Sequence, residues 1–214
     1  MEKIYLITFL DRGRYMIKII KKTLFIIYLF FSWLLLQPFC WFFYDRKYLR
    51  GRWFKKWIFS EGWEWCKRDI VHRIFYGQNI SLKFPCSPYI TCTPDIEFHT
   101  DDLNNLNGFG NYFQAFNGGK IIIGKGTWIA KNVGIITVNH DIYNPDLHQE
   151  PKNVILGESC WVGMNAMILP GVVLGPHTVV GAGSVVTKSF PDGYCVIAGN
   201  PAKKIKDLKL YIKE

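Results

Sequence analysis

The C-terminal half of the chain repeats an aliphatic residue at every sixth position. The longest run holds six positions in register: Leu156, Val162, Ile168, Leu174, Val180 and Val186. Four positions after each of the first five stands a small or medium residue: Cys160, Ala166, Val172, Thr178 and Ser184. Shorter runs with the same spacing are Ile123, Ile129 and Ile135, and, more faintly, Phe84, Ile90 and Ile96.

A period of six predicts short flat strands joined by tight turns. An α-helix with an apolar residue only every six positions has no continuous apolar stripe, and a half-buried strand alternates every two residues. In the repeat the aliphatic side chain points inward, the small residue fills the corner, and glycine permits the turn. Three hexads close one triangular coil of a parallel β-helix. The pattern assigns one such coil to each of residues 123–140, 156–173 and 174–191.

The repeat is broken once, between Asn139 and Val154, by the polar segment HDIYNPDLHQEPKN. A long excursion from a regular solenoid is usually functional. His140 stands at its base, and an imidazole is suited to accepting a proton near neutral pH. We therefore predict that His140 is a catalytic base.

The N-terminal region predicts a membrane helix. Residues 23–44 run for 22 positions without a charge, and a helix of that length is about 33 Å long, close to the roughly 30 Å of a hydrocarbon core. Basic clusters flank both ends, and Pro38 is expected to break the helix. A re-entrant or interfacial helix satisfies both facts and is preferred to a single span or a buried helix. No small-residue cleavage site follows, which argues against a signal peptide.

The formal charge of +9 belongs to this region. Residues 1–60 hold 12 basic and 3 acidic side chains, whereas residues 61–214 hold 14 of each. A neutral body behind a basic, aromatic head argues against nucleic-acid binding and favours an anionic membrane surface. Trp53 and Trp57 share one helical face, which predicts a helix at the headgroup level or, alternatively, one packed on the body.

Three segments are expected: a basic, aromatic membrane-associated helical region at 1–79, a β-helix at 80–207 and a tail at 208–214. The six cysteines form no Cys-x-x-Cys pair. They are interpreted as reduced structural thiols of a cytosol-facing protein, with a Cys86–Cys92 disulfide as the alternative.

The segments IIIGKGTWIAKNVGIITVNHD and CWVGMNAMILPGVVLGPHTVVGAGSVVTKSFPDGYCVIAGNPAKKIK resemble the hexapeptide-repeat acyltransferases, and within them the maltose and galactoside O-acetyltransferase branch and the polysaccharide O-acetyltransferases. The resemblance is strong over 120–206 and weak over 80–119. It implies a mainly β protein, a left-handed parallel β-helix, here with an N-terminal membrane-associated helical segment.

The resemblance also implies roles for single residues. His140 is the base that takes the acceptor proton, and Asn139 is a contact near the acceptor or the oxyanion, or a plain turn residue. Trp161 packs near the sugar acceptor or caps the coil. Asp141 orients the imidazole, faces the acceptor or is a solvated loop acid. The acetyl-CoA donor is expected to contact Gly163, Asn165, Gly181, Ala182, Thr187, Lys188, Lys203 and Lys204.

A γ-carbonic anhydrase on the same fold needs three zinc histidines, two of them five residues apart. The five histidines contain no such pair, so no metal is expected.

The combined prediction is an acetyl-CoA-dependent O-acetyltransferase of a surface polysaccharide or lipid-linked glycan. It is expected to act as a homotrimer at the cytoplasmic face of a bacterial membrane. Two alternatives stay open: an N-acetyltransferase of an amino-sugar nucleotide, and a non-catalytic β-helix scaffold docked to the membrane.

Overall fold

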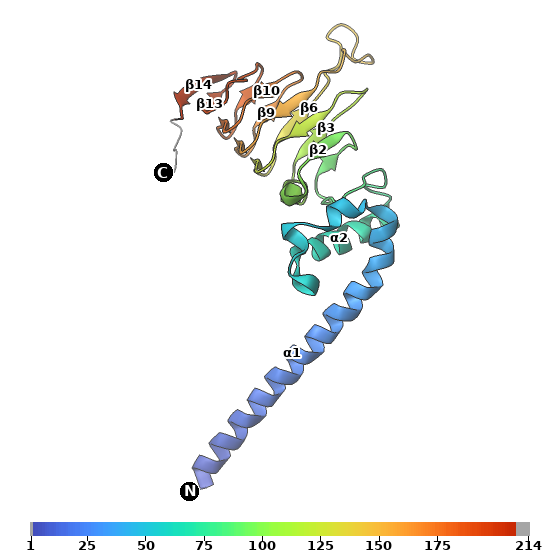
Figure 1. Ribbon diagram of the computed structural model, residues 1–214, viewed down its shortest axis with the longest axis vertical. Coiled ribbons are helices and arrows are strands. Elements are labelled where there is room, and N and C mark those ends of the chain that lie inside the picture. The colour runs from blue at the N-terminus through green and yellow to red at the C-terminus, as the bar shows by residue number, and fades with distance from the viewer. Residues whose placement is uncertain (1, 209–214) are drawn as a thin grey trace.

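A computed structural model describes the backbone of residues 2–208 and side chains from residue 15 onward. A long helix points away from a small helical layer, and a β-helix stands on the other side of that layer (Figure 1). Most of the tail expected at 208–214 lies outside the described residues.

The β-helix has three faces, each a sheet of short strands. One face has the order β1–β3–β6–β9–β12, the second β2–β4–β7–β10, and the third β5–β8–β11–β13–β14. We call them faces A, B and C. The pairing between coils is parallel throughout, except for the closing β13–β14 hairpin. The strands are β1 Thr91–Cys92, β2 Ile96–Phe98, β3 Tyr112–Gln114, β4 Ile121–Ile123, β5 Trp128–Ile129, β6 Gly134–Ile136, β7 Val154–Leu156, β8 Trp161–Val162, β9 Met167–Ile168, β10 Val173–Leu174, β11 Val179–Val180, β12 Val185–Val186, β13 Cys195–Gly199 and β14 Ala202–Asp207.

The hexad residues form the core, as the sequence pattern predicts. All six aliphatic residues of the longest run are at most 1% exposed. Leu156 pairs with Leu174, and Val162 with Val180, so three hexads complete one coil in this region. Phe84, Ile90 and Ile96 of the faint run are buried too, whereas Ile129 is half-buried. Each fully buried aliphatic side chain contributes roughly 1.5–3 kcal/mol before chain entropy is subtracted.

Glycine is required where the coils approach closely at the corner between faces B and C. A Cβ on Gly124 would lie 2.4 Å from the Gly157 carbonyl carbon, and one on Gly157 would lie 2.6 Å from that of Gly175. The stacked backbones leave no room for a side chain at this corner.

The excursion expected after Asn139 is a projecting loop. Ile123 pairs with Leu156, and Leu156 in turn pairs with Leu174, so the first of these two coils is much the longer. The extra length is inserted at the corner between faces A and B, where the chain leaves β6 and returns as β7. The loop projects beyond the β-helix (Figure 1).

Helix α1 spans Glu2–Phe43, and the break predicted at Pro38 is wrong. Pro38 lies inside the helix, close to its C-terminal end. The Gln37 side-chain amide donates to the Trp33 carbonyl at 3.3 Å, one position before the carbonyl that Pro38 leaves without a donor. A re-entrant turn at this proline is therefore absent. Among the described residues, Tyr15–Phe43 is the one helix long and apolar enough to cross a membrane, with mean hydropathy 1.9.

The single helix predicted to present Trp53 and Trp57 on one face is also wrong. This region forms three 3-10 turns, η1 Arg46–Leu49, η2 Arg52–Phe54 and η3 Trp57–Phe59, followed by α2 Glu61–Tyr76. The Trp53 indole N–H donates to the Asp101 carbonyl at 2.6 Å, in the 3-10 helix η4 Thr100–Leu106. Trp57 packs edge-on against Trp33 of α1. The two indoles thus face different partners, and Trp53 packs on the body.

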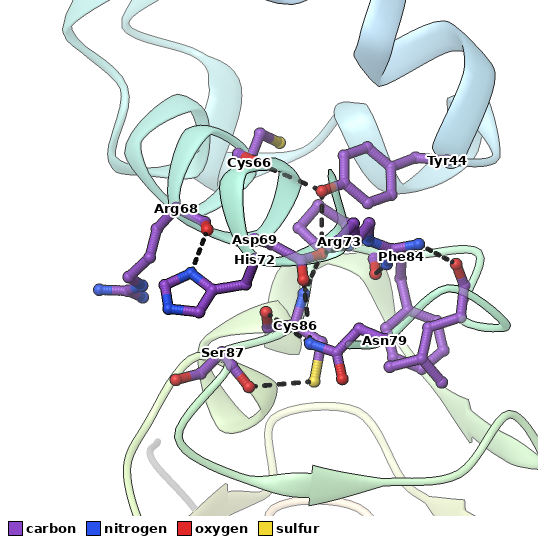
Figure 2. A network of polar contacts seen from close by, with 12 residues as sticks. Tyr44, Cys66, Arg68, Asp69, His72, Arg73, Asn79, Phe84, Cys86 and Ser87 are labelled. Atoms are coloured by element: carbon purple, nitrogen blue, oxygen red, sulfur yellow. Dashed lines mark hydrogen bonds and ion pairs between the residues drawn. The ribbon is translucent and has the colours of Figure 1, made fainter. Parts of the chain in front are cut away.

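Hydrogen bonds around a buried ion pair of α2 join the head, which is the N-terminal region up to residue 79, to the β-helix (Figure 2). Arg73 Nε donates to Asp69 at 2.9 Å, and neither side chain is exposed to solvent. The Tyr44 hydroxyl, just after α1, donates to the same carboxylate, as does the Cys86 N–H at the entry to the β-helix. Arg73 also donates to the Leu82 and Phe84 carbonyls. Burial next to this carboxylate raises the pKa of the Tyr44 hydroxyl.

The six cysteines are free thiols, so the alternative of a Cys86–Cys92 disulfide is wrong. Burial raises the pKa of the Cys66 and Cys86 thiols, which keeps them protonated and unreactive.

Replacing Asp69 with Ala should destabilise the chain strongly, because the Arg73 guanidinium would stay buried without its counter-ion. The expected loss is about 3–5 kcal/mol, measured by chemical unfolding of the full chain in detergent. Glu64→Ala, which breaks the exposed pair with Lys67, is the matched control and should leave the midpoint nearly unchanged. Equal midpoints for both variants would contradict this role of Asp69.

Candidate active site

The inserted loop closes on itself as a small hairpin. His140 and His148 form an antiparallel bridge. On either side of it, Asp141 N–H donates to the Leu147 carbonyl and Gln149 N–H to the Asn139 carbonyl. These bonds hold the base of the loop in one register, so the two imidazoles lie side by side.

A backbone carbonyl orients the His140 imidazole. Its Nδ1 lies 2.6 Å from the Pro145 carbonyl oxygen. Because a carbonyl only accepts hydrogen bonds, the neutral ring carries its proton on Nδ1 and leaves the lone pair on Nε2. His140 is exposed, so Nε2 is open to a reactant. The His148 ring packs against the His140 ring, with 4.5 Å between the ring centroids. Phe116 packs against His148, with 5.3 Å between the centroids.

Asp141 has a different place from the one that would orient the imidazole. Its Oδ1 accepts the N–H groups of Tyr143 and Asn144 at 2.8 and 3.0 Å, which stabilises the turn of the loop. Asn139 is exposed beside His140. An acceptor role for either residue stays a prediction.

The sequence gives no role to Pro145 and predicts that His148 is a loop residue facing the acceptor or solvent. Both contact the His140 ring. The sequence feature that points to these contacts is a pair of histidines on either side of a turn that contains a proline. It predicts the contacts only when the pairing of the two sides of the loop is known.

Trp161 does not meet His140 within one chain. It lies on β8 of face C, 57% exposed, in register with the exposed Trp128 of the preceding coil. The His140 loop leaves face A and returns to face B, at the corner opposite face C. The predicted base His140 and the predicted acceptor contact Trp161 therefore lie on different sides of the molecule.

The residues expected to hold the donor flank face A. Gly163, Asn165, Gly181 and Ala182 lie at its corner with face C, and Thr187 and Lys188 lie at the corner that bears the His140 loop. The two glycines also have a packing role. A Cβ on Gly163 would lie 2.6 Å from the Ala182 nitrogen, and one on Gly181 would lie 2.9 Å from the Ala198 Cβ.

Lys203 and Lys204 are exposed on β14 at the edge of face C. Lys204 forms a 2.7 Å ion pair with Asp207, which raises the pKa of its ammonium. Among the side chains of residues 15–208, no cluster of three His, Cys, Asp or Glu has a geometry that could hold a metal ion.

Comparison with known proteins decides the family. A family model described as "Bacterial transferase hexapeptide (six repeats)" matches residues 153–188. A protein of Escherichia coli (strain K12) named "Putative lipopolysaccharide biosynthesis O-acetyl transferase WbbJ" is 34% identical over an alignment of 172 residues, which covers 65% of this chain and 85% of that protein. The chain belongs to the hexapeptide-repeat acyltransferases. It is thus an enzyme of the acyltransferase class, and the family implies a left-handed winding for its β-helix.

The branch that the sequence motifs indicate is represented among the relatives. The galactoside O-acetyltransferase of Lactococcus lactis is 39% identical over 94 residues, 41% of this chain and 44% of that protein. The solved maltose O-acetyltransferase from Clostridium difficile 630 is 31% identical, with a TM-score of 0.46, over 58% of this chain and 66% of that one.

The Pro145 contact predicts the tautomer of His140. Nitrogen NMR of the full chain above the imidazole pKa should show the His140 ring protonated on Nδ1, because the carbonyl requires a donor there. A His140→Gln variant assigns the signal by its loss. A ring protonated on Nε2 would contradict the geometry that exposes a basic lone pair.

Proposed function

We propose that the chain is an acetyl-CoA-dependent O-acetyltransferase that modifies a sugar hydroxyl of a surface polysaccharide or lipid-linked glycan. The observation that carries the proposal is the orientation of His140 by the Pro145 carbonyl at the one long interruption of the β-helix. The names of the relatives, an O-acetyl transferase of lipopolysaccharide biosynthesis and a galactoside O-acetyltransferase, support a sugar hydroxyl as acceptor.

In the proposed reaction, Nε2 of His140 accepts the proton of the sugar hydroxyl while that oxygen attacks the thioester carbonyl of the donor. The new C–O bond forms, the C–S bond breaks, and the proton passes from Nε2 to the leaving thiolate. The exchange of a thioester for an oxygen ester needs no further reactant. Pro145 keeps the ring in the tautomer that can accept this proton.

The donor is proposed to lie along face A, between its two corners. Gly163, Gly181 and Ala182 offer a close backbone approach at one corner, and Thr187 and Lys188 stand at the corner of the His140 loop. The exposed ammonium group of Lys203 would bind the phosphates of the donor. Because Trp161 faces away from His140 in one chain, its acceptor role needs a second copy, which fits the expected homotrimer.

The proposed location is the cytoplasmic face of a membrane, with α1 as the anchor. Five consecutive residues of α1, Leu24 to Tyr28, are between 38% and 59% exposed. Since neighbouring helix positions are about 100° apart, they surround the helix with apolar side chains. A helix at the membrane surface has one polar face, so this pattern favours insertion into the hydrocarbon core. The Asp69–Arg73 junction would then hold the β-helix near the lipid.

Replacing His140 with Ala should lower acetyl transfer by about 10²–10⁴-fold, the usual contribution of a general base. Release of free thiol from acetyl-CoA, with glycan acceptors present, measures it. His177→Ala is the matched control, because His177 is an exposed histidine on the turn before β11, and it should act as the wild type.

Near-normal turnover of His140→Ala would contradict the proposed base. Transfer confined to amino sugars would instead favour N-acetylation. The alternative of a non-catalytic scaffold is wrong, because the chain belongs to an acyltransferase family.

Charging α1 should release the chain from membranes. Phe31 and Leu35 are 56% and 71% exposed, and an aspartate near the centre of a membrane helix costs about 2.5–3.5 kcal/mol. The Phe31→Asp, Leu35→Asp double variant should fail to float with vesicles of phosphatidylethanolamine and phosphatidylglycerol. Alanine at both positions is the control and should float. Equal flotation of the two variants would contradict insertion of α1.

A further inference from the structure

A cavity of about 520 Å³ lies between the turn after α2 and the first coils of the β-helix. This volume is within the range of about 300–1,000 Å³ typical of ligand pockets. The turn contributes Gln78 and Asn79 to the lining, and the first coils contribute Tyr89, Thr91, Asn111 and Tyr112. The head of the chain and its β-helix therefore share this cavity, and neither forms it alone.

Tyr89 is held in place on one wall. Its ring packs against His72 of α2 at 6.1 Å and against Phe109 at 5.7 Å. Its N–H donates to Ser87 Oγ at 3.3 Å, and its carbonyl accepts Gly110 N–H at 2.9 Å. Even so, 52% of the residue is exposed. Such an aromatic ring, ordered before any ligand arrives, loses little conformational freedom on binding.

The remaining lining is polar and uncharged. None of the cavity residues is acidic or basic. Asn111 Oδ1 accepts Val133 N–H at 3.0 Å, which fixes the orientation of its carboxamide. Gln78 adds an exposed carboxamide and Thr91 a hydroxyl. An aromatic face beside amide and hydroxyl groups fits a neutral polyhydroxylated ring, which presents C–H groups to the aromatic face and hydroxyls to the amides. A phosphorylated or acidic ligand would find no counter-charge among these residues.

Strand β3 links this cavity to the catalytic loop. Tyr112, at the cavity, begins β3 on the outer surface of face A, in register with Thr91. Four positions later Phe116 contacts His148, which packs against His140. Four residues of extended chain span roughly 13 Å, and the ring-centroid distances from Phe116 to His148 and from His148 to His140 add up to 5.3 and 4.5 Å more. A ligand that reaches from the cavity to His140 is therefore an oligosaccharide of several sugar units.

We propose that this cavity is a glycan subsite, which holds a neutral sugar unit of the same acceptor whose hydroxyl is acetylated at His140. The inference rests on the proposed function and adds to it an acceptor longer than one sugar. The turn after α2 forms one wall of the subsite. This gives the head a part in acceptor binding in addition to anchoring.

The test is direct binding of de-O-acetylated surface oligosaccharide from the source cells to the full chain in detergent, by calorimetry without acetyl-CoA. Tyr89→Ala and Gln78→Ala should each raise the dissociation constant, by about tenfold for the lost aromatic contact. Tyr194→Ala is the matched control, because its ring packs against His177 at the far end of the β-helix, and it should bind as the wild type does. Equal binding by all variants, or no binding by the wild type, overturns the subsite.

Steady-state kinetics distinguish a failure of the subsite from a failure of the proposed function. With acetyl-CoA present, Tyr89→Ala should raise KM for the oligosaccharide while kcat and the KM for acetyl-CoA stay unchanged, as expected for lost uniform binding. An unchanged KM with normal acetyl transfer overturns the subsite and leaves the function intact. Oligosaccharide binding that depends on Tyr89 but leads to no acetyl transfer supports the subsite and contradicts the function.

Discussion

Parallel pairing between successive coils is the constraint on which the rest of the molecule depends. Three hexads complete one coil, so each inward aliphatic residue lies directly above the one three hexads earlier, as Leu174 lies over Leu156. Glycines such as Gly157 allow the backbones to stack this closely. A segment that does not fit the register must leave the coil at a corner. The loop inserted after face A does so, and it carries His140 out of the core to an exposed position.

The coils could be predicted because their signal is local and periodic. An aliphatic residue every six positions identifies the inward side chains from Leu156 to Val186, and the interruption marks the loop. The N-terminal region has no such period. Pro38 follows a strong local rule, yet it lies so near the end of α1 that the helix continues past it. The separate partners of Trp53 and Trp57 depend on contacts with residues far away in sequence. The same is true of Asp69, which accepts hydrogen bonds from Tyr44 and Cys86.

Only part of the candidate site could be predicted from the sequence. His140 stands at the base of the interruption, where residue type and position coincide. Its orientation by Pro145 depends on the hairpin register of the loop, which no periodicity encodes. The placement of Trp161 on face C follows from counting coils, and it separates two residues that the family resemblance assigns to one site. The cavity beside Tyr89 needs both the head and the first coils, so a division of the chain at residue 79 obscures it.

In the proposed function, α1 anchors the chain, the hydrogen bonds around Asp69 fix the β-helix to that anchor, and His140 takes the proton from a glycan hydroxyl as it attacks acetyl-CoA. The decisive measurement is mass spectrometry of surface glycans in cells that lack the gene and carry either the wild-type chain or His140→Ala. An acetyl group at one defined sugar position should be present with the wild-type chain and missing with the variant. The same acetylated glycan in both cells would contradict a role of His140 in acetyl transfer.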